Sequence, residues 1–417
     1  MEEWKEYQLK DATTVLGDGL HGTPKYDENG TVFFINGNNL VDGKIEIKES
    51  TKRVSEDEAN KYKKNLNSRT ILVSINGTIG NVAKYQGEAC ILGKSACYFN
   101  VSEDFDLNFI YYVVASKQFK NSITHLSTGT TIKNVSLETM RNYSFAAPSI
   151  NEQKRIAELL SSLDDKIELN RRINDNLEQQ AQALFKSWFV DFEPFRDGKF
   201  VDSELGTTPK ELPIVYIQNI PHNIESGKRP KGGATLKGIP SIGAENIKGL
   251  GYYDYSKTKY IPQEYAQTIK KGKINGYELL IYKDGGKPGY FIPNFSIFGE
   301  GFPFSKMYIN EHVFLLDLMD NGYNAFAYFY MHTPYIINQF NSNGGKAAIP
   351  GINTKDVECL PIYSKESPYV KRFGEIVLPF IKTILSNSLE NARLAKMRDT
   401  LLPKLMSGKL KISEIEI

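Results

Sequence analysis

The sequence has few cysteines and no long apolar run, and each shortage excludes a class of protein. Cys90, Cys97 and Cys359 are odd in number and lack metal-ligand spacing, which argues against a disulfide framework and a zinc site. We expect all three to be buried as small apolar side chains. No stretch reaches the ~18–20 consecutive apolar residues of a membrane helix, and the start MEEWKEYQLK lacks a signal-peptide core, so we expect a cytoplasmic protein.

The chain also has almost no net charge, because 51 basic residues face 49 acidic ones and leave a net charge of +2. Bulk attraction to nucleic acid is therefore excluded, and any basic surface must be local. Basic clusters occur at 61–64 (KYKK), 227–233 (GKRPKGG) and 270–273 (KKGK). For any one of these clusters, solvated lysine on a loop is the ordinary interpretation, and phosphate binding is the alternative.

Motifs of catalysis and cofactor binding are missing as well. The five histidines form no HxxxH or HxH pair, and 283–289 (KDGGKPG) lacks the GK[ST] ending of a phosphate-binding loop. The glycines of 298–302 (FGEGF) lack the acidic partner of a dinucleotide site, and no NPPY-like tetrapeptide of amino-methyltransferases is present. We expect no catalytic residue, metal or cofactor in this chain, with an active site that forms only in space as the alternative.

What the sequence does contain is an internal repeat. The segment at 23–25 (TPK) aligns with 229–231 (RPK), 33–40 (FFINGNNL) with 240–247 (PSIGAENI), and 71–80 (ILVSINGTIG) with 279–288 (LLIYKDGGKP). The offset is 206 to 208 residues and rises to 217 where 129–136 aligns with the segment ending at 354. One insertion of about ten residues explains the change, so the chain is two copies of one unit.

Each copy ends in a predicted long helix whose inward positions follow one another in steps of four and three, as in a coiled coil. The first set is Ile156, Leu160, Leu163, Ile167, Asn170, Asn174, Leu177, Ala181, Leu184 and Trp188; the second is Phe373, Val377, Phe380, Ile384, Asn387, Asn391, Leu394, Arg398, Leu401 and Leu405. Every member of the second set lies 217 residues after its counterpart. We call these positions the seam, and we expect the two helices to be each other's partners.

Two asparagines occupy the same two seam positions in both helices. A polar residue in a seam lowers stability while fixing register, because its amide needs a partner inside the interface. We expect the four asparagines to form one polar layer. A seam of this length covers roughly 50 Å at about 1.5 Å per residue, which is enough to separate two domains. Ser149 and Glu152 have the spacing of a capping box and mark the start of the first helix. Pro379 predicts a kink in the second helix.

The segments between the helices predict mixed α and β domains. Short apolar runs at 31–35, 70–75, 278–282 and 312–318 indicate strands. Longer apolar segments at 107–119 and 326–340 indicate one buried helix each. We expect an α+β chain with domains at 1–148 and 197–365, a central helix within 149–196 and a carboxyl-terminal helix within 366–417.

Over essentially its whole length the sequence resembles the specificity subunits of type I restriction-modification systems. The resemblance lies in the duplicated plan and in 17–26 (GDGLHGTPKY), 225–247 (ESGKRPKGGATLKGIPSIGAENI), 185–195 (FKSWFVDFEPF) with 203–206 (SELG), and 401–412 (LLPKLMSGKLKI). It implies two target recognition domains that each read half of a split, asymmetric DNA site, separated by antiparallel helices related by a pseudo-two-fold axis. One departure is that 211–220 (ELPIVYIQNI) lacks the tryptophan that Trp4 supplies in the first copy.

The resemblance also implies that the chain docks two methyltransferase subunits and, optionally, two restriction subunits that act as motor and nuclease. S-adenosylmethionine, ATP and magnesium are then expected on those partners and not on this chain. The alternative functions are a free-standing, repressor-like DNA-binding protein or an orphan homologue. A repressor binds tightly by itself, whereas a specificity subunit needs its methyltransferase partner.

Residues at matching positions of the two copies are the candidates for DNA contact. Phosphates are contacted by lysine, threonine and backbone amides, and bases by amides and guanidinium groups. The candidates are Thr23, Lys25, Asn76, Thr78, Thr128, Thr130, Thr131 and Lys133 in the first copy and Lys228, Arg229, Lys231, Lys283, Lys287 and Lys346 in the second. A structural role in turns is the alternative for each of them.

Overall fold

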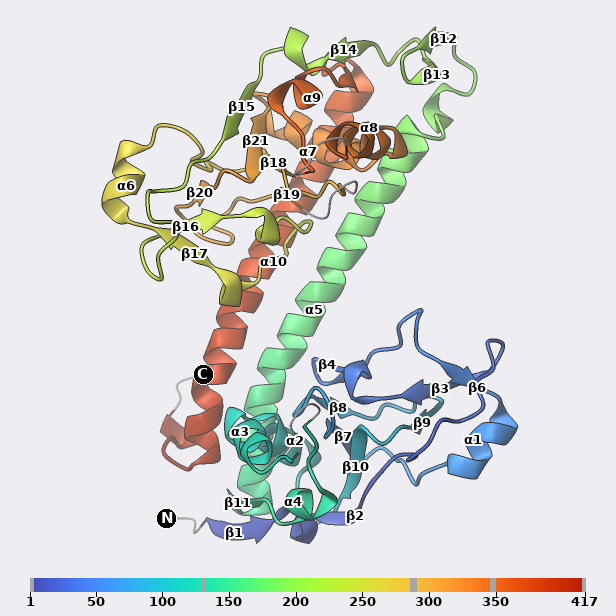
Figure 1. Ribbon diagram of the computed structural model, residues 1–417, viewed down its shortest axis with the longest axis vertical. Helices are drawn as coiled ribbons and strands as arrows, with labels where there is room; N and C mark the ends of the chain where they lie inside the picture. Colours follow the sequence, from blue (N-terminus) through green and yellow to red (C-terminus); the bar gives the residue numbers. More distant parts are fainter. Residues whose placement is uncertain (1–3, 129–132, 286–290, 346–349, 415–417) are drawn as a thin grey trace. The chain divides into compact units, whose positions relative to one another are not determined.

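The computed structural model describes residues 4–128, 133–285, 291–345 and 350–414, which form two units (Figure 1). Unit 1 comprises Met1–Asp165 and Leu394–Ile417, and unit 2 comprises Lys166–Arg393. Each unit therefore joins one globular domain to a segment of each long helix. No helix among the described residues is long and apolar enough to cross a membrane.

Unit 1 is built on an antiparallel sheet in the order β2-β10-β7-β8 (Thr13–Asp18, Ala96–Val101, Thr70–Ser74, Val82–Lys84). The sheet has two buried faces, because Ile71 and Val73 of β7 join one hydrophobic cluster while Leu72 between them joins another. A smaller sheet has the order β6-β3-β9 (Arg53–Val54, Val32–Ile35, Cys90–Leu92), and β1 (Lys5–Gln8) pairs with β11 (Ser144–Ala147). The remaining strands, β4 (Leu40–Val41) and β5 (Lys44–Ile45), form a pair.

Unit 2 repeats this plan except for the β4–β5 pair, which has no counterpart among its described strands. Its main sheet has the order β15-β21-β18-β19 (Asn223–Ser226, Val313–Asp317, Leu279–Tyr282, Phe295–Ile297) and its smaller sheet the order β17-β16-β20 (Lys259–Ile261, Ile239–Ile242, Tyr308–Ile309). The pair β14 (Ile214–Tyr216) and β22 (Pro361–Tyr363) corresponds to β1 and β11. A hairpin of β12 (Phe200–Ser203) and β13 (Gly206–Pro209) has no counterpart among the described strands of unit 1.

A shared turn shows how closely the copies agree. The side-chain carbonyl of Asn39 accepts a 3.0 Å hydrogen bond from the backbone amide of Asn36, and that of Asn246 accepts a 2.9 Å bond from Gly243. Both turns follow the middle strand of a small sheet, at the positions that the sequence alignment equates. The four expected strands are also present, as β3, β7, β18 and β21. The predicted repeat and the predicted α+β fold are therefore confirmed.

Three expectations were wrong in detail. The segment 107–119 contains two helices, α2 (Leu107–Ala115) and α3 (Lys117–His125), because Ser116 is extended and its hydroxyl accepts from the amide of Phe119 to cap α3. The segment 326–340 likewise spans α7 (Asn321–Met331) and α8 (Pro334–Gly344), since Pro334 disfavours a helical Thr333 before it. Cys97 is buried, but Cys90 is partly exposed and Cys359 is exposed.

The other short helices are α1 (Glu56–Tyr62), α4 (Leu137–Arg141), α6 (Gln263–Thr268) and α9 (Thr354–Glu358). The chain further contains the short 3-10 helices η1 (Leu9–Ala12), η2 (Gly37–Asn39), η3 (Glu193–Phe195), η4 (Ile217–Asn219), η5 (Ala244–Asn246), η6 (Tyr255–Lys257) and η7 (Ile412–Glu414). The order α2-α3-α4 in unit 1 matches the order α7-α8-α9 in unit 2, so the repeat extends to the helices that follow each main sheet.

The two long helices are α5 (Ile150–Phe189) and α10 (Pro368–Met406). Every seam position named above is buried or half-buried, whereas Leu169, outside the seam, is 52% exposed. Helix α10 continues through Pro379, and the predicted kink there stays a prediction. Within unit 2 the seams meet antiparallel, because Asn170 donates to Asn391 at 2.9 Å and Asn387 donates to Asn174 at 2.9 Å. The expected polar layer is thus two hydrogen-bonded pairs one helical turn apart.

Candidate nucleic-acid interface

The first group of candidate residues in unit 1 lies where the loop after β7 meets the segment before α4. The backbones of Thr128 and Asn134 exchange hydrogen bonds of 2.9 and 2.8 Å, and the side-chain amide of Asn76 donates to that of Asn134 at 3.2 Å. The amide of Gly77 donates to the carbonyl of Lys133 at 3.2 Å. The structure therefore brings Asn76, Thr128 and Lys133 together, with the last two exposed.

The neighbouring candidates are Thr78, at the tip of the loop after β7, and the pair Thr130 and Thr131. Thr78 is exposed, and its backbone carbonyl accepts from the hydroxyl of Ser74, so the tip of this loop is fixed from inside. Thr130 and Thr131 lie outside the described residues. A loop whose backbone is held by hydrogen bonds presents its exposed side chains in a defined geometry, which recognition of a rigid duplex requires.

A second group in unit 1 lies against α1. Thr23 and Lys25 are exposed, and the backbone amide of Lys25 donates to the carboxylate of Glu58 at 2.8 Å. This hydrogen bond, together with an ion pair of 2.7 Å to Lys61, lowers the pKa of the Glu58 carboxyl. The segment at 23–25 and the basic cluster at 61–64 are thus neighbours, joined through one carboxylate.

Unit 2 brings its two basic clusters together in the same way. Gly272 lies so close to the end of β15 that a Cβ added to it would be 3.2 Å from the Cα of Gly227. Gly272 also accepts a 2.7 Å backbone hydrogen bond from Ile309. The exposed lysines beside these glycines are Lys228, Lys231, Lys270, Lys271 and Lys273. Two clusters that are far apart in sequence therefore form one basic surface.

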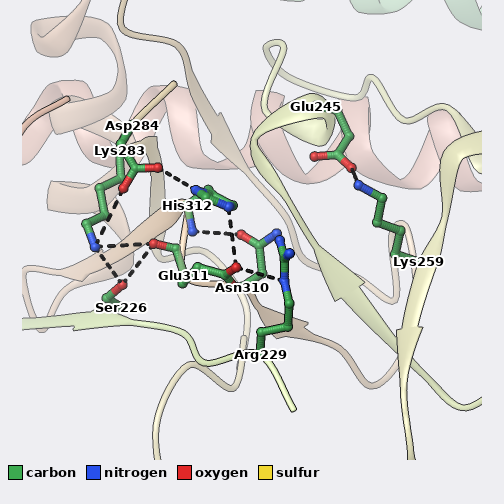
Figure 2. A network of polar contacts seen from close by, with 9 residues as sticks. All are labelled: Ser226, Arg229, Glu245, Lys259, Lys283, Asp284, Asn310, Glu311 and His312. Atoms are coloured by element: carbon green, nitrogen blue, oxygen red, sulfur yellow. Dashed lines mark hydrogen bonds and ion pairs between the residues drawn. The ribbon is translucent and has the colours of Figure 1, made fainter. Parts of the chain in front are cut away.

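A polar network adjoins this surface (Figure 2). The Nε of Arg229 lies 2.7 Å from a carboxylate oxygen of Glu311, and His312 lies between that carboxylate, at 3.3 Å, and the carboxylate of Asp284. The ammonium of Lys283 donates to the carbonyl of Glu311 at 3.2 Å. Lys283 thus has intramolecular partners already, and its side chain is only 26% exposed.

The loop that carries Asp284 corresponds to the loop that carries Asn76. Asp284 forms an antiparallel bridge with Gly351, as Asn76 does with Asn134. The two copies therefore place the same pair of segments side by side but equip them with different side chains. Lys287 and Lys346, which sequence reasoning assigned to this surface, lie outside the described residues.

Sequence reasoning missed Glu311, His312 and Ser226. They lie on a turn and at a strand end, in positions where the alignment of the two copies marks nothing unusual. The three residues before the apolar run of β21 (Asn310, Glu311 and His312) are all polar, which is ordinary for a turn. Their importance arises from tertiary contacts with Arg229 and Lys283, which no local pattern encodes.

The described residues contain no group of three or more His, Cys, Asp or Glu side chains that could hold a metal ion. What they do contain is a pair of like domains, each with exposed basic and amide side chains on fixed loops and each joined to both long helices. Paired domains with exposed basic side chains on fixed loops are an arrangement that suits DNA recognition at two places.

The comparisons with known proteins agree on one family. Residues 1–179 match the family model described as the type I restriction modification DNA specificity domain. The chain is 26% identical to the type I restriction enzyme MjaIX specificity subunit of Methanocaldococcus jannaschii, over 83% of this chain and 78% of that one. It is 25% identical to the HindI specificity subunit of Haemophilus influenzae, over 98% and 100% of the two chains. Over most of its length the chain is therefore similar to the specificity subunits of type I restriction-modification systems.

The fold agrees with this assignment. A crystal structure of a type I restriction-modification S subunit from M. genitalium superposes with a TM-score of 0.59 at 20% sequence identity. The superposition covers 97% of this chain and 96% of that one. Both globular domains and both long helices therefore have counterparts in a solved structure.

Proposed function

We propose that the chain is a specificity subunit and that each of its units reads one half of a split, asymmetric DNA site. The observation that carries the proposal is that both units place equivalent loops side by side, but these loops carry different side chains at equivalent positions. Asn76 in unit 1 corresponds to Asp284 in unit 2, and Thr23 corresponds to Arg229. An amide, a carboxylate and a guanidinium prefer different base edges in the major groove, so equivalent surfaces with these groups select different bases.

The exposed lysines and threonines around these loops would contact phosphates. Such contacts fix the register of a protein on the duplex without reading sequence, and they make binding dependent on salt. Thr23, Lys25, Thr78, Thr128, Lys133, Lys228 and Lys231 are all exposed and suit this role. Thr130, Thr131, Lys287 and Lys346 remain candidates by sequence alone.

We further propose that α5 and α10 space the two readers and dock two methyltransferase subunits, with two restriction subunits as optional members of the same complex. S-adenosylmethionine, ATP and magnesium would be bound by those partners. DNA modification by such a complex takes place in the cytoplasm. The paired seams support this proposal, because a helix pair with fixed register is a rigid spacer.

A domain exchange tests the proposal. Replacing residues 1–148 with the corresponding domain of another specificity subunit cuts the chain between β11, which ends at Ala147, and α5, which begins at Ile150. Methylation mapping in cells that also produce the cognate methyltransferase should show one half of the site changed and the other half retained. Exchanging residues 197–365 should change only the other half. Unchanged methylation sites in an active exchanged complex would refute the proposal.

Co-purification tests whether the chain binds a methyltransferase subunit. The chain should be recovered with its methyltransferase subunit, and the complex should bind DNA more tightly than the chain alone. Full affinity of the isolated chain, without gain from the partner, would favour a free-standing DNA-binding protein.

A further inference from the structure

Arg229 is held in a specific orientation by a carboxylate behind it. Its Nε lies 2.7 Å from the Oε1 atom of Glu311, and the two side chains are 46% and 33% exposed. Among the described residues, neither terminal nitrogen of the guanidinium donates a hydrogen bond, and the closest approach of the ion pair is through Nε. The carboxylate thus lies nearest the inner nitrogen of the guanidinium, and the outer N–H groups remain available to donate hydrogen bonds.

The turn that carries Glu311 is held by hydrogen bonds to its own carbonyl and to both neighbouring residues. The adjacent Asn310 donates to the carbonyl of Ile242 at 2.8 Å, and the backbone amide of His312 donates to the Asn310 side chain at 2.9 Å. The carbonyl of Glu311 accepts from Lys283 at 3.2 Å and from Ser226 at 3.4 Å. Figure 2 shows Lys283 and Ser226 meeting the turn that carries Glu311.

The same contacts tie Arg229 to its support. Ser226 is the last residue of β15, three positions before Arg229, and its hydroxyl also accepts from the Lys283 ammonium at 3.4 Å. Lys283 therefore links the strand that leads to Arg229 with the turn that presents Glu311. The second carboxylate oxygen of Glu311 is buried and has no hydrogen-bond partner among the described residues, so this side chain does not reach freely into solvent.

We propose that Arg229 reads a guanine in the half-site of unit 2 and that Glu311 is its positioning residue; this inference rests on the proposed function. A guanidinium with a free outer edge presents two parallel donors, which match the O6 and N7 acceptors of guanine in the major groove. The orientation is set before binding, so less side-chain entropy is lost when the two bonds form. The neighbouring lysines of the basic surface supply phosphate contacts.

Unit 1 lacks this device. Thr23 stands at the position equivalent to Arg229, and a threonine hydroxyl cannot form the bidentate bond to guanine. The two half-sites should therefore differ at the base that these positions face. That difference makes the inference testable within a single complex, because unit 1 serves as the internal reference.

The experiment is methylation mapping with the full chain and its methyltransferase subunit, comparing wild type with Arg229→Ala and Arg229→Lys. At one position of the unit 2 half-site, we expect the preference of the complex for guanine over the other bases to fall by about tenfold to a hundredfold in both variants. Lysine keeps the charge and can keep the ion pair to Glu311, but it lacks the fork geometry, so Arg229→Lys separates base reading from charge and from folding. Glu311→Gln should weaken the preference at the same base and nowhere else.

Lys259→Ala is the matched control. Lys259 forms a 2.6 Å ion pair with Glu245 in the same unit, and the two side chains are 53% and 31% exposed, close to the values for Arg229 and Glu311. Figure 2 shows both pairs. The loss of the Lys259 side chain should leave every base preference unchanged.

The inference is overturned if Arg229→Lys keeps all base preferences, or if preference falls equally in both half-sites. It is also overturned if Lys259→Ala changes the same base. The domain exchange described above distinguishes a failure of the Arg229 inference from a failure of the proposed function. If the domain exchange changes the sequence of one half-site while the Arg229 variants change no base preference, only the role of Arg229 is refuted. If the domain exchange leaves the methylation sites unchanged, the proposed function is refuted.

Discussion

The side-chain amide of Asn170 donates a 2.9 Å hydrogen bond to the side-chain carbonyl of Asn391, across the two long helices of unit 2. The same amide donates to the carboxylate of Glu390 at 2.7 Å, and Asn174 and Asn387 form the second pair. The side chain of Asn170 is almost wholly buried, at 1% exposure. A buried amide with partners on the opposite helix fixes the register of the helix pair, because a shift would leave it unpaired.

The first prediction concerns this pair. Asn170→Leu should lower the free energy of unfolding by about 1–3 kcal/mol, because Asn391 and Glu390 lose their buried donor. The double variant Asn170→Leu with Asn391→Leu should recover part or all of that loss, since two apolar side chains replace both partners. Chemical denaturation of the four members of this cycle measures the coupling. Asn176→Leu, at an exposed position of the same helix, is the control, and equal losses for the single and double variants would contradict the pairing.

The second prediction concerns the ion pair in the seam of unit 1. Arg398 donates to Asp164 at 2.6 Å, and the hydroxyl of Tyr112 donates to the same carboxylate at 2.7 Å. Asp164→Ala should cost about 1.5–3 kcal/mol in unfolding free energy, because Tyr112 loses its acceptor and Arg398 is left with Asp399 as its remaining acidic partner. Arg155→Ala breaks an exposed ion pair with Glu152 on the same helix and should cost less than about 1 kcal/mol. Thermal denaturation would refute the assignment if the two variants behaved alike.

Much of the fold could be predicted because it rests on periodic patterns. The steps of four and three that place Asn170 and Asn391 in the seams are visible in the sequence, and so is the short apolar run at 70–75 that forms β7. The breaks at Ser116 and Thr333 were missed, since apolar residues continue across both. One capping hydroxyl or one proline changed the outcome without changing the hydrophobic pattern.

The candidate site was predictable only in part. Repeat positions pointed to Arg229 and Asn76, because equivalent segments of two copies occupy equivalent places. Glu311 and His312 could not be found in this way, since their role depends on segments about 80 residues apart meeting at one turn. The joining of the basic clusters at Gly227 and Gly272 is likewise a tertiary contact.

The third prediction concerns the helix-packing glycine of unit 2. A Cβ on Gly374 of α10 would lie 2.6 Å from the carbonyl oxygen of Gly322 at the start of α7, a backbone atom that cannot rotate away. Gly374→Ala should therefore lower stability by about 1–3 kcal/mol, even though alanine favours helix elsewhere. Ser386→Ala at an exposed position of the same helix should have little effect. Differential scanning calorimetry that finds Gly374→Ala neutral or stabilising would contradict the close approach.

The fourth prediction concerns phosphate contact by unit 1. Lys133 is exposed beside Asn76 and Thr128, so Lys133→Ala should weaken DNA binding by the complex at all sequences and reduce the slope of log K against log salt by about 1. Base preference should not change, because a phosphate contact carries no sequence information. Lys10→Ala removes an equally exposed lysine on η1, away from the candidate residues in sequence, and should leave the slope unchanged. An unaltered slope for Lys133→Ala would remove this residue from the interface.

The fifth prediction concerns acid stability and His332 of unit 2. Burial lowers the pKa of this imidazole, although a hydrogen bond with the carbonyl of Tyr328 partly offsets the effect. The folded state therefore holds His332 neutral at a pH where the unfolded chain, with an ordinary histidine pKa of about 6.5, already binds a proton. Because the unfolded state binds more protons, the free energy of unfolding should fall as the pH drops below about 6.5, by up to about 1.4 kcal/mol per pH unit from this one group. The loss should level off below the pKa of the folded state.

Replacing the imidazole isolates its contribution. His332→Phe cannot bind a proton, so its unfolding free energy should decline less steeply than that of the wild type between pH 7 and pH 5, whatever its absolute stability. His125→Phe, which replaces an exposed histidine at the end of α3, controls for the histidine-to-phenylalanine change itself. Urea denaturation at a series of pH values compares the three slopes. If His332→Phe and the wild type lose stability in parallel, His332 is not protonated on unfolding in this range, and the acid sensitivity of unit 2 must arise from other groups.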